Sequence, residues 1–135
     1  FIVLYLAFAK CVGKWAILFS HPADFTPVCT TEIGKLALKQ DELQEMDCLI
    51  ATLSVDPVKS HEEWIRDVVA HCENKIEVKF PIIGDADRSI SKAYGMIDMG
   101  TSDKQELPLT IRYVSSCEYL YVYMLNFAIG FQIHF

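Results

Sequence analysis

Apolar residues recur along this chain in two patterns, short unbroken runs and stripes with the period of a helix. The unbroken runs predict four buried strands, at residues 16–19, 49–55, 78–83 and 109–114. The stripes predict three helices, at residues 27–46, 58–72 and 90–94. Strands and helices therefore alternate, which is typical of an α/β fold with helices covering a central sheet.

The predicted helix ends carry recognisable local signals. Thr26 precedes Pro27, which places a hydroxyl at the N-cap and a proline at the first helical position. Gly95 closes the third helix. The apolar residues that we expect to face the core in the first two helices are Ile33, Leu36, Leu43 and Met46, and then Trp64, Ile65, Val68 and Val69.

Composition fits one globular domain. The 135 residues are 52% hydrophobic and 22% charged, which is enough apolar material for a core and too little charge for a disordered chain. The net charge of −6 argues against a general nucleic-acid binder, which needs a concentrated basic face. The apolar stretches at residues 1–9 and 119–131 are short for a membrane span, and the first has no basic segment before it as a secretory signal would. Phe1 in place of a methionine suggests that the start is missing.

The cysteines favour a reducing compartment, and we expect a cytoplasmic protein. There are five, an odd number, and none forms a Cys-x-x-Cys pair. A disulfide scaffold usually has dense, even cysteines, and a thioredoxin-type disulfide reductase needs Cys-x-x-Cys. The simpler interpretation is free thiols, one of which is reactive.

Cys29 is the candidate for that reactive thiol. It falls in the first turn of a predicted helix, just after a strand. Unpaired N–H groups and the helix dipole favour negative charge there, and the thiolate is the nucleophilic form of cysteine. By position alone, a buried structural cysteine remains the alternative.

The residues around Cys29 carry a more specific signal. Residues 21–32 read His-Pro-Ala-Asp-Phe-Thr-Pro-Val-Cys-Thr-Thr-Glu. This run resembles the peroxiredoxin signature Pro-x-x-x-Thr-x-x-Cys, and its longer form resembles the 1-Cys, peroxiredoxin-6-like subfamily. Further likeness lies at residues 53–56, 60–64, 80–83 and 107–112. We therefore expect a peroxiredoxin domain over residues 13–114, with residues 1–12 and 115–135 unlike the family and the domain truncated at both ends.

The resemblance implies a thioredoxin-like fold and the reduction of hydrogen peroxide and organic hydroperoxides. It places the peroxidatic cysteine at Cys29, with Thr26, Pro22 and Arg112 as its catalytic partners and Arg112 on a late strand. An arginine offers fixed donors and a permanent charge to a thiolate and a peroxide together. Pro22 would limit the access of water. His21 and Glu32 are expected in supporting roles, His21 near the cysteine and Glu32 favouring the helix start.

The resemblance also bears on how the oxidised cysteine is restored. Two-cysteine members use a second cysteine near the C-terminus, often in Val-Cys-Pro, and no such triplet follows Cys29. We expect a 1-Cys type with no cofactor, an external thiol such as glutathione as reductant, and a homodimer as in the family. Of the remaining cysteines, Cys48 is expected in the core, Cys72 at a helix end, and Cys11 and Cys117 in the unlike segments.

Three other functions compare less well with the sequence. A hydrolase activity of some subfamily members needs a serine where this chain has Lys14, so we do not expect it. An inactive, truncated binding or regulatory module is the main alternative, favoured by the atypical ends and opposed by the intact motif. A zinc site could draw on His21, His61, His71, Cys48 and Cys72, but only His71 and Cys72 are close in sequence.

Overall fold

The structure is a computed structural model that describes residues 14–102 and 107–117. Its main sheet has the strand order β3-β2-β1-β6. The strands β1 (Trp15–Ser20), β2 (Cys48–Ser54) and β3 (Ile82–Gly84) are parallel, and β6 (Tyr113–Cys117) pairs antiparallel with β1. A separate antiparallel pair is formed by β4 (Ile97–Ser102) and β5 (Pro108–Thr110).

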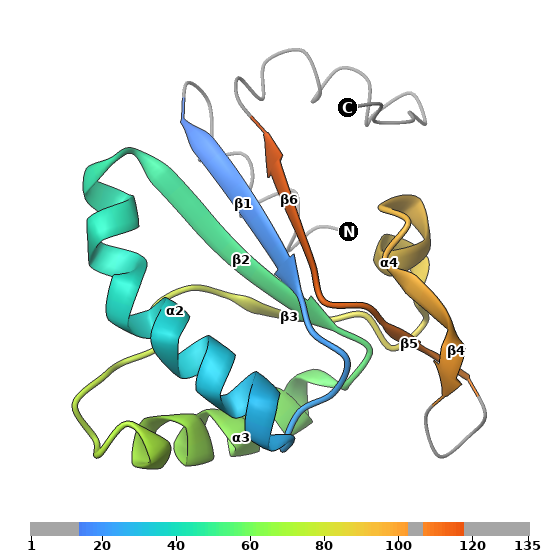
Figure 1. The fold of residues 1–135 in the computed structure, drawn as a ribbon, viewed down its shortest axis with the longest axis horizontal. Coiled ribbons are helices and arrows are strands. Elements are labelled where there is room, and N and C mark those ends of the chain that lie inside the picture. Colours follow the sequence, from blue (N-terminus) through green and yellow to red (C-terminus); the bar gives the residue numbers. More distant parts are fainter. Residues whose placement is uncertain (1–13, 103–106, 118–135) are drawn as a thin grey trace.

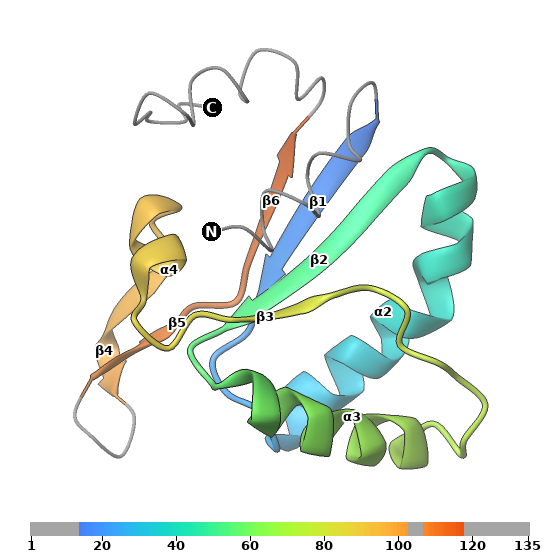
Figure 2. The same cartoon turned by 180° about the vertical axis from the view of Figure 1, so that it is seen from behind.

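Helices cover both faces of the main sheet (Figures 1 and 2). The helices α2 (Pro27–Glu45) and α3 (Val58–His71) pack on one face, and the short α4 (Ser89–Ala93) lies on the other. Each face has its own apolar cluster. The cluster under α2 and α3 consists of Cys29, Ile33, Ala37, Trp64, Val68 and Phe80. The cluster beside α4 consists of Leu18, Ala51, Leu53, Ile83, Ile90 and Met96.

The α/β layering predicted from the sequence is confirmed, and β1, β2, α3 and α4 lie within two residues of their predicted bounds. Two strand predictions were wrong. The run at 78–83 contributes only Ile82–Gly84 to the sheet, because the Gln40 side chain accepts from Lys79 N (2.9 Å) and donates to Glu77 O (2.6 Å). Those backbone groups therefore bond to α2 and not to a neighbouring strand.

The run at 109–114 is two strands in two sheets. It breaks at Ile111 and Arg112, where Ile111 N donates to Met96 O (2.9 Å) and Ser20 Oγ donates to Ile111 O (2.7 Å). After this break β6 continues to Cys117, three residues past the expected domain boundary. The hairpin of β4 and β5 was not predicted, because Asp98 and Gly100 interrupt the apolar pattern of β4.

The buried face of α2 also differs from its prediction. Ile33 is buried, but Met46 is 62% exposed, because the helix ends at Glu45, one residue earlier. The face is completed instead by Cys29, Gly34, Ala37 and Gln40. No helix among the described residues is long and apolar enough to cross a membrane. The apolar stretches at 1–9 and 119–131, and Cys11, lie outside the described residues.

Gly34 of α2 lies against Cys72, the C-cap residue of α3, and this contact gives a testable prediction. A Cβ at this position would lie 2.7 Å from Cys72 Sγ. We expect Gly34→Ala to destabilise the protein by about 1–3 kcal/mol through overpacking. In a Cys72→Ala background the clash is gone, and the same change should stabilise by about 0.5–1 kcal/mol, because alanine favours a helix over glycine. Urea unfolding of the four variants measures both effects; equal effects in both backgrounds would contradict the contact.

Candidate active site

Cys29 lies in the first turn of α2, as predicted. It is the third residue of the helix and has no exposed surface. Its neighbours in the apolar cluster include Ile33 and Trp64. The sulfur is thus held at the positive end of a 19-residue helix, where the first N–H groups lack intrahelical acceptors.

Arg112, which is distant in the sequence, contacts this sulfur. Its Nη2 donates to Cys29 Sγ at 3.4 Å, and its Nε donates to Glu32 Oε2 at 2.8 Å. The hydrogen bond to Glu32, opposed by burial and helped by the Cys29 sulfur, raises the pKa of Arg112 further above its ordinary value. The guanidinium therefore stays charged, and Glu32, one helical turn beyond Cys29, aims it at the sulfur.

The fold explains how two residues 83 positions apart come together. Arg112 does not lie on a strand, as the resemblance had implied, but in the break between β5 and β6. Ser20, the last residue of β1, pairs with Tyr113, the first residue of β6. The break therefore lies beside the loop that leads from β1 into α2, and this places Arg112 at the start of α2.

Thr26 and Pro22 lie in that same loop. Thr26 occupies the N-cap position of α2, but the prediction that its hydroxyl caps the helix is wrong: Oγ1 donates to Ala23 O at 3.2 Å. This bond closes the turn that precedes the helix. Pro22 is half-buried two residues after β1. Both residues are near the start of α2, and their contacts with a peroxide stay a prediction.

His21 belongs to a buried polar network centred on Asp24. The Asp24 carboxylate accepts from His21 Nε2 (3.0 Å), His61 Nδ1 (2.7 Å) and Ser60 Oγ (2.6 Å). The His21 ring also packs against Trp64, with ring centroids 4.9 Å apart. Burial raises the pKa of Asp24, but the hydrogen bonds from His21, His61 and Ser60 outweigh it and hold that pKa well below its usual range.

The sequence interpretation gave no role to Asp24 or Ser60 and considered His61 only as a possible zinc ligand, although all three lie in the segments that carry the family resemblance. One signal was available. His61 precedes Trp64, Ile65 and Val68 by three, four and seven residues, so it shares the apolar face of α3. A histidine on a buried face needs a polar partner.

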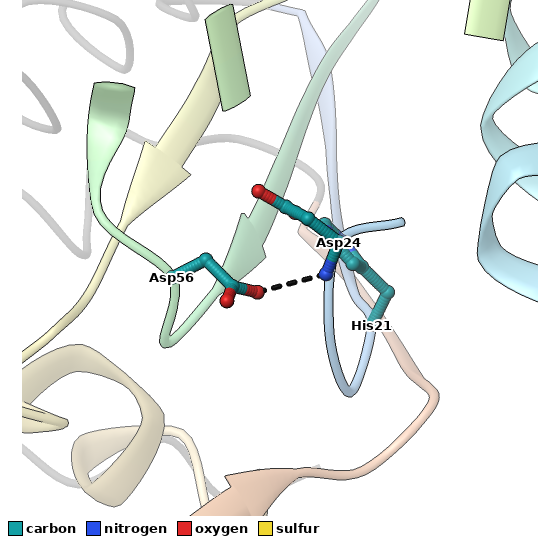
Figure 3. Close-up of side chains that lie close together, drawn as sticks. All are labelled: His21, Asp24 and Asp56. Atoms are coloured by element: carbon teal, nitrogen blue, oxygen red, sulfur yellow. Dashed lines mark hydrogen bonds and ion pairs between the residues drawn. The ribbon is translucent and has the colours of Figure 1, made fainter. Parts of the chain in front are cut away.

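The residues proposed for a zinc site are not brought together. Among the described residues, the one group of three or more whose potential ligand atoms all lie within 4.8 Å of one another is His21, Asp24 and Asp56. Figure 3 shows the Asp56 carboxylate directed at the backbone N–H of Asp24, which donates to Asp56 Oδ2 at 2.9 Å. The Asp24 carboxylate is already taken by three donors. Hydrogen bonds therefore occupy the Asp24 carboxylate and one oxygen of Asp56.

The other described cysteines are poor candidates for the reactive thiol. Cys48 is buried, as expected, and burial raises the pKa of its thiol, which works against ionisation. Cys72 caps the end of α3, and Cys29, Cys48 and Cys72 are all free. Of these three cysteines, Cys29 alone has an arginine donor on its sulfur.

Comparison with known proteins agrees with this geometry. The sequence pattern of the AhpC/TSA family matches residues 6–114, starting seven residues before the boundary expected from the sequence. A 1-Cys peroxiredoxin of Dictyostelium discoideum is 47% identical over 89 residues, which are 65% of this chain and 36% of that protein. The chain thus spans less than half of the curated relatives it matches.

Two solved structures of this kind share the fold. A cysteine-to-serine mutant of peroxiredoxin 6 from Arenicola marina superposes with a TM-score of 0.77 at 34% identity, over 82% of this chain and 50% of that one. A yeast mitochondrial 1-Cys peroxiredoxin, whose structure addresses thiol resolution through glutathione and thioredoxin systems, gives 0.64 at 32% identity, over 83% and 59%. The predicted thioredoxin-like fold of the peroxiredoxin type is therefore confirmed.

Proposed function

Since this chain belongs to the AhpC/TSA family of peroxiredoxins, we propose that it is a thiol-dependent peroxidase whose reacting atom is Cys29 Sγ. The observation that carries the proposal is the Arg112 Nη2 contact with that sulfur, 3.4 Å long, at the first turn of α2. Two sources of positive potential, a guanidinium and a helix start, act on one sulfur atom. Neither Cys48 nor Cys72 has a comparable arginine contact among the described residues.

The proposed reaction is a two-electron oxidation of the Cys29 sulfur by the peroxide. The Cys29 thiolate attacks one peroxide oxygen, the S–O bond forms and the O–O bond breaks. The sulfur loses two electrons and becomes a sulfenic acid, while the other oxygen leaves as water or an alcohol after taking up a proton. Negative charge builds on that leaving oxygen, and the remaining Arg112 donors and the N–H groups at the start of α2 offer it hydrogen bonds. Thr26 and Pro22 would shape the loop where the peroxide binds.

Access to the sulfur follows from the same contacts. Cys29 has no exposed surface, whereas the Arg112 side chain is 45% exposed. A peroxide that approaches along the guanidinium meets its donors before it reaches the sulfur. We therefore expect the peroxide to approach Cys29 from the side of the exposed guanidinium.

An external thiol would complete the cycle. A first thiol condenses with the sulfenic acid to a mixed disulfide and water, and a second thiol releases Cys29 and leaves as a disulfide. Glutathione is the proposed reductant, supported by the likeness to the yeast 1-Cys protein. The raised pKa of buried Cys48 makes it a poor internal substitute. The substrates that we predict are hydrogen peroxide and organic hydroperoxides, and a homodimer and a cytoplasmic location also stay predictions. Among the described side chains, the free thiols of Cys29, Cys48 and Cys72 fit a reducing compartment.

Trapping the sulfenic acid tests this function. One equivalent of hydrogen peroxide is added to the full reduced chain with dimedone, and the adduct is mapped by mass spectrometry. We expect a single adduct on Cys29, because it is the thiol held next to a permanent cation. A parallel sample blocked with iodoacetamide before peroxide should carry none. An adduct on Cys48 or Cys72, with Cys29 unmodified, would refute the assignment.

A further inference from the structure

Asp24 is a buried carboxylate that joins the loop before Cys29 to the next helix along the chain. Its side chain is 1% exposed and accepts one hydrogen bond from His21, in its own loop, and two from Ser60 and His61, in the first turn of α3. A buried charge is tolerated only where donors surround it, so these bonds fix Asp24 against α3. The loop is thereby attached to a helix that contains none of the residues expected to react.

The residue after Asp24 shows why the loop needs such an attachment. Phe25 has a φ of 57°, in the left-handed region that a residue with a Cβ rarely adopts. Its side chain is 52% exposed, so its own packing does not hold this conformation. The turn from Phe25 into Thr26 and Pro27 sets the position of the first turn of α2. The bond from Thr26 Oγ1 to Ala23 O closes this turn, and Asp24, immediately before Phe25, fixes it against α3.

A second bond ties the other side of the reactive cysteine to α3. Trp64 Nε1 donates to Thr30 Oγ1 at 3.0 Å, and Thr30 Oγ1 donates to Thr26 O at 2.8 Å. Trp64 is fully buried and packs on the His21 ring. α3 therefore holds the chain both before Cys29, through Asp24, and after it, through Thr30.

We propose that Asp24, held by His61, is a positioning residue for the peroxidase reaction: it keeps the loop in the strained conformation that sets Thr26 and the start of α2 around the Cys29 sulfur. This inference rests on the proposed peroxidase function and extends it to two residues that touch neither sulfur nor Arg112 in the hydrogen bonds of the described chain. Its chemical content is orientation, because Asp24 exchanges no electron or proton with the peroxide.

The test compares two reactions of the same thiol. Reaction with peroxide needs the donors arranged around the sulfur, whereas alkylation by iodoacetamide needs only an accessible thiolate. We expect Asp24→Asn, which keeps the shape and removes the charge, to lower the ratio of the two rate constants at Cys29 by about tenfold or more, as misplacement of a reacting group does. Both rates are measured on the full chain, with the alkylated peptide identified by mass.

His61 provides the matched pair of variants. The side-chain amide of His61→Asn can place an N–H near the position of Nδ1, whereas His61→Leu leaves Asp24 without that donor. We expect His61→Asn to keep the ratio near that of the wild type and His61→Leu to lose it. Asp85→Asn is the control for loss of any buried carboxylate, because Asp85 is 2% exposed and accepts from Ile90 N and Ser91 N on the α4 side of the sheet. It should leave the ratio unchanged.

The outcomes separate this inference from the function on which it rests. A wild-type chain that consumes no peroxide refutes the peroxidase. An active wild type with an unchanged ratio in Asp24→Asn overturns the positioning role, and so does an equal fall of both rates, which is what a purely structural residue would give. If Asp24→Asn does not fold, the His61 pair decides: equal ratios in His61→Asn and His61→Leu overturn the proposal.

Discussion

Replacing Cys29 by serine should remove all peroxide consumption above that of dithiothreitol in buffer. The substitution changes one atom at a fully buried position, so the fold should persist. A serine hydroxyl stays un-ionised beside the Arg112 guanidinium and cannot form a sulfenic acid. The measurement is the loss of hydrogen peroxide with dithiothreitol as reductant, wild type against Cys29→Ser at equal concentration, with circular dichroism to compare the folds.

The other described thiols supply the controls. Cys72→Ser and Cys48→Ala should each keep a peroxidase rate close to that of the wild type. Cys72 lies at the end of α3 and Cys48 at the start of β2, and neither contacts Arg112 among the described hydrogen bonds. Equal rates in wild type and Cys29→Ser would reject the enzyme and revive the inactive binding module.

The sequence predicted the part of the site that is local in the chain. Cys29 could be placed at a helix start because Thr26-Pro27 signals that start within three residues. The parallel strands β1 and β2 were found for a similar reason, since buried parallel strands read as unbroken apolar runs. The hydroxyl of Thr26 was misassigned, because a threonine before a helix can bond either forward to the helix or back to the turn, and only the loop geometry decides.

Contacts between residues far apart in the chain were harder to predict from the sequence. Arg112 was reached only through family resemblance, and its place in a break between two strands follows from pairings of β5 with β4 and of β6 with β1. The buried Asp24 network depends on α3 packing against the loop, which no local pattern reveals. Gln40 is a further example. Its side chain accepts a hydrogen bond from the backbone of Lys79, 39 residues away, where the apolar run had predicted pairing between strands.

Arg112→Met should lower the rate constant for reaction of Cys29 with hydrogen peroxide by about a hundredfold to a thousandfold, the usual cost of removing a donor aimed at developing charge. Methionine keeps an unbranched apolar stem and removes both the charge and the N–H groups. The rate constant of Arg112→Lys should lie between those of the wild type and Arg112→Met. Lysine keeps the charge but lacks the planar fork that donates to Glu32 and Cys29 at the same time. Stopped-flow measurement of sulfenic acid formation gives these rate constants directly.

Because the ion pair of Arg112 and Glu32 is half-exposed, a fall in the peroxide rate of Arg112→Met can be distinguished from unfolding. The Arg112 and Glu32 side chains are 45% and 47% exposed, and a half-exposed ion pair contributes at most about 1 kcal/mol to stability. Arg112→Met should therefore melt within a few degrees of the wild type while its peroxide rate falls, since about 1 kcal/mol shifts the melting temperature of a small domain by only a few degrees. Glu32→Gln tests the orientation of the guanidinium separately from its charge. This change leaves Arg112 intact but weakens the hydrogen bond that orients it, so the peroxide rate should fall less than in Arg112→Met. A peroxide rate in Arg112→Met equal to that of the wild type would mean that the helix start alone activates the sulfur.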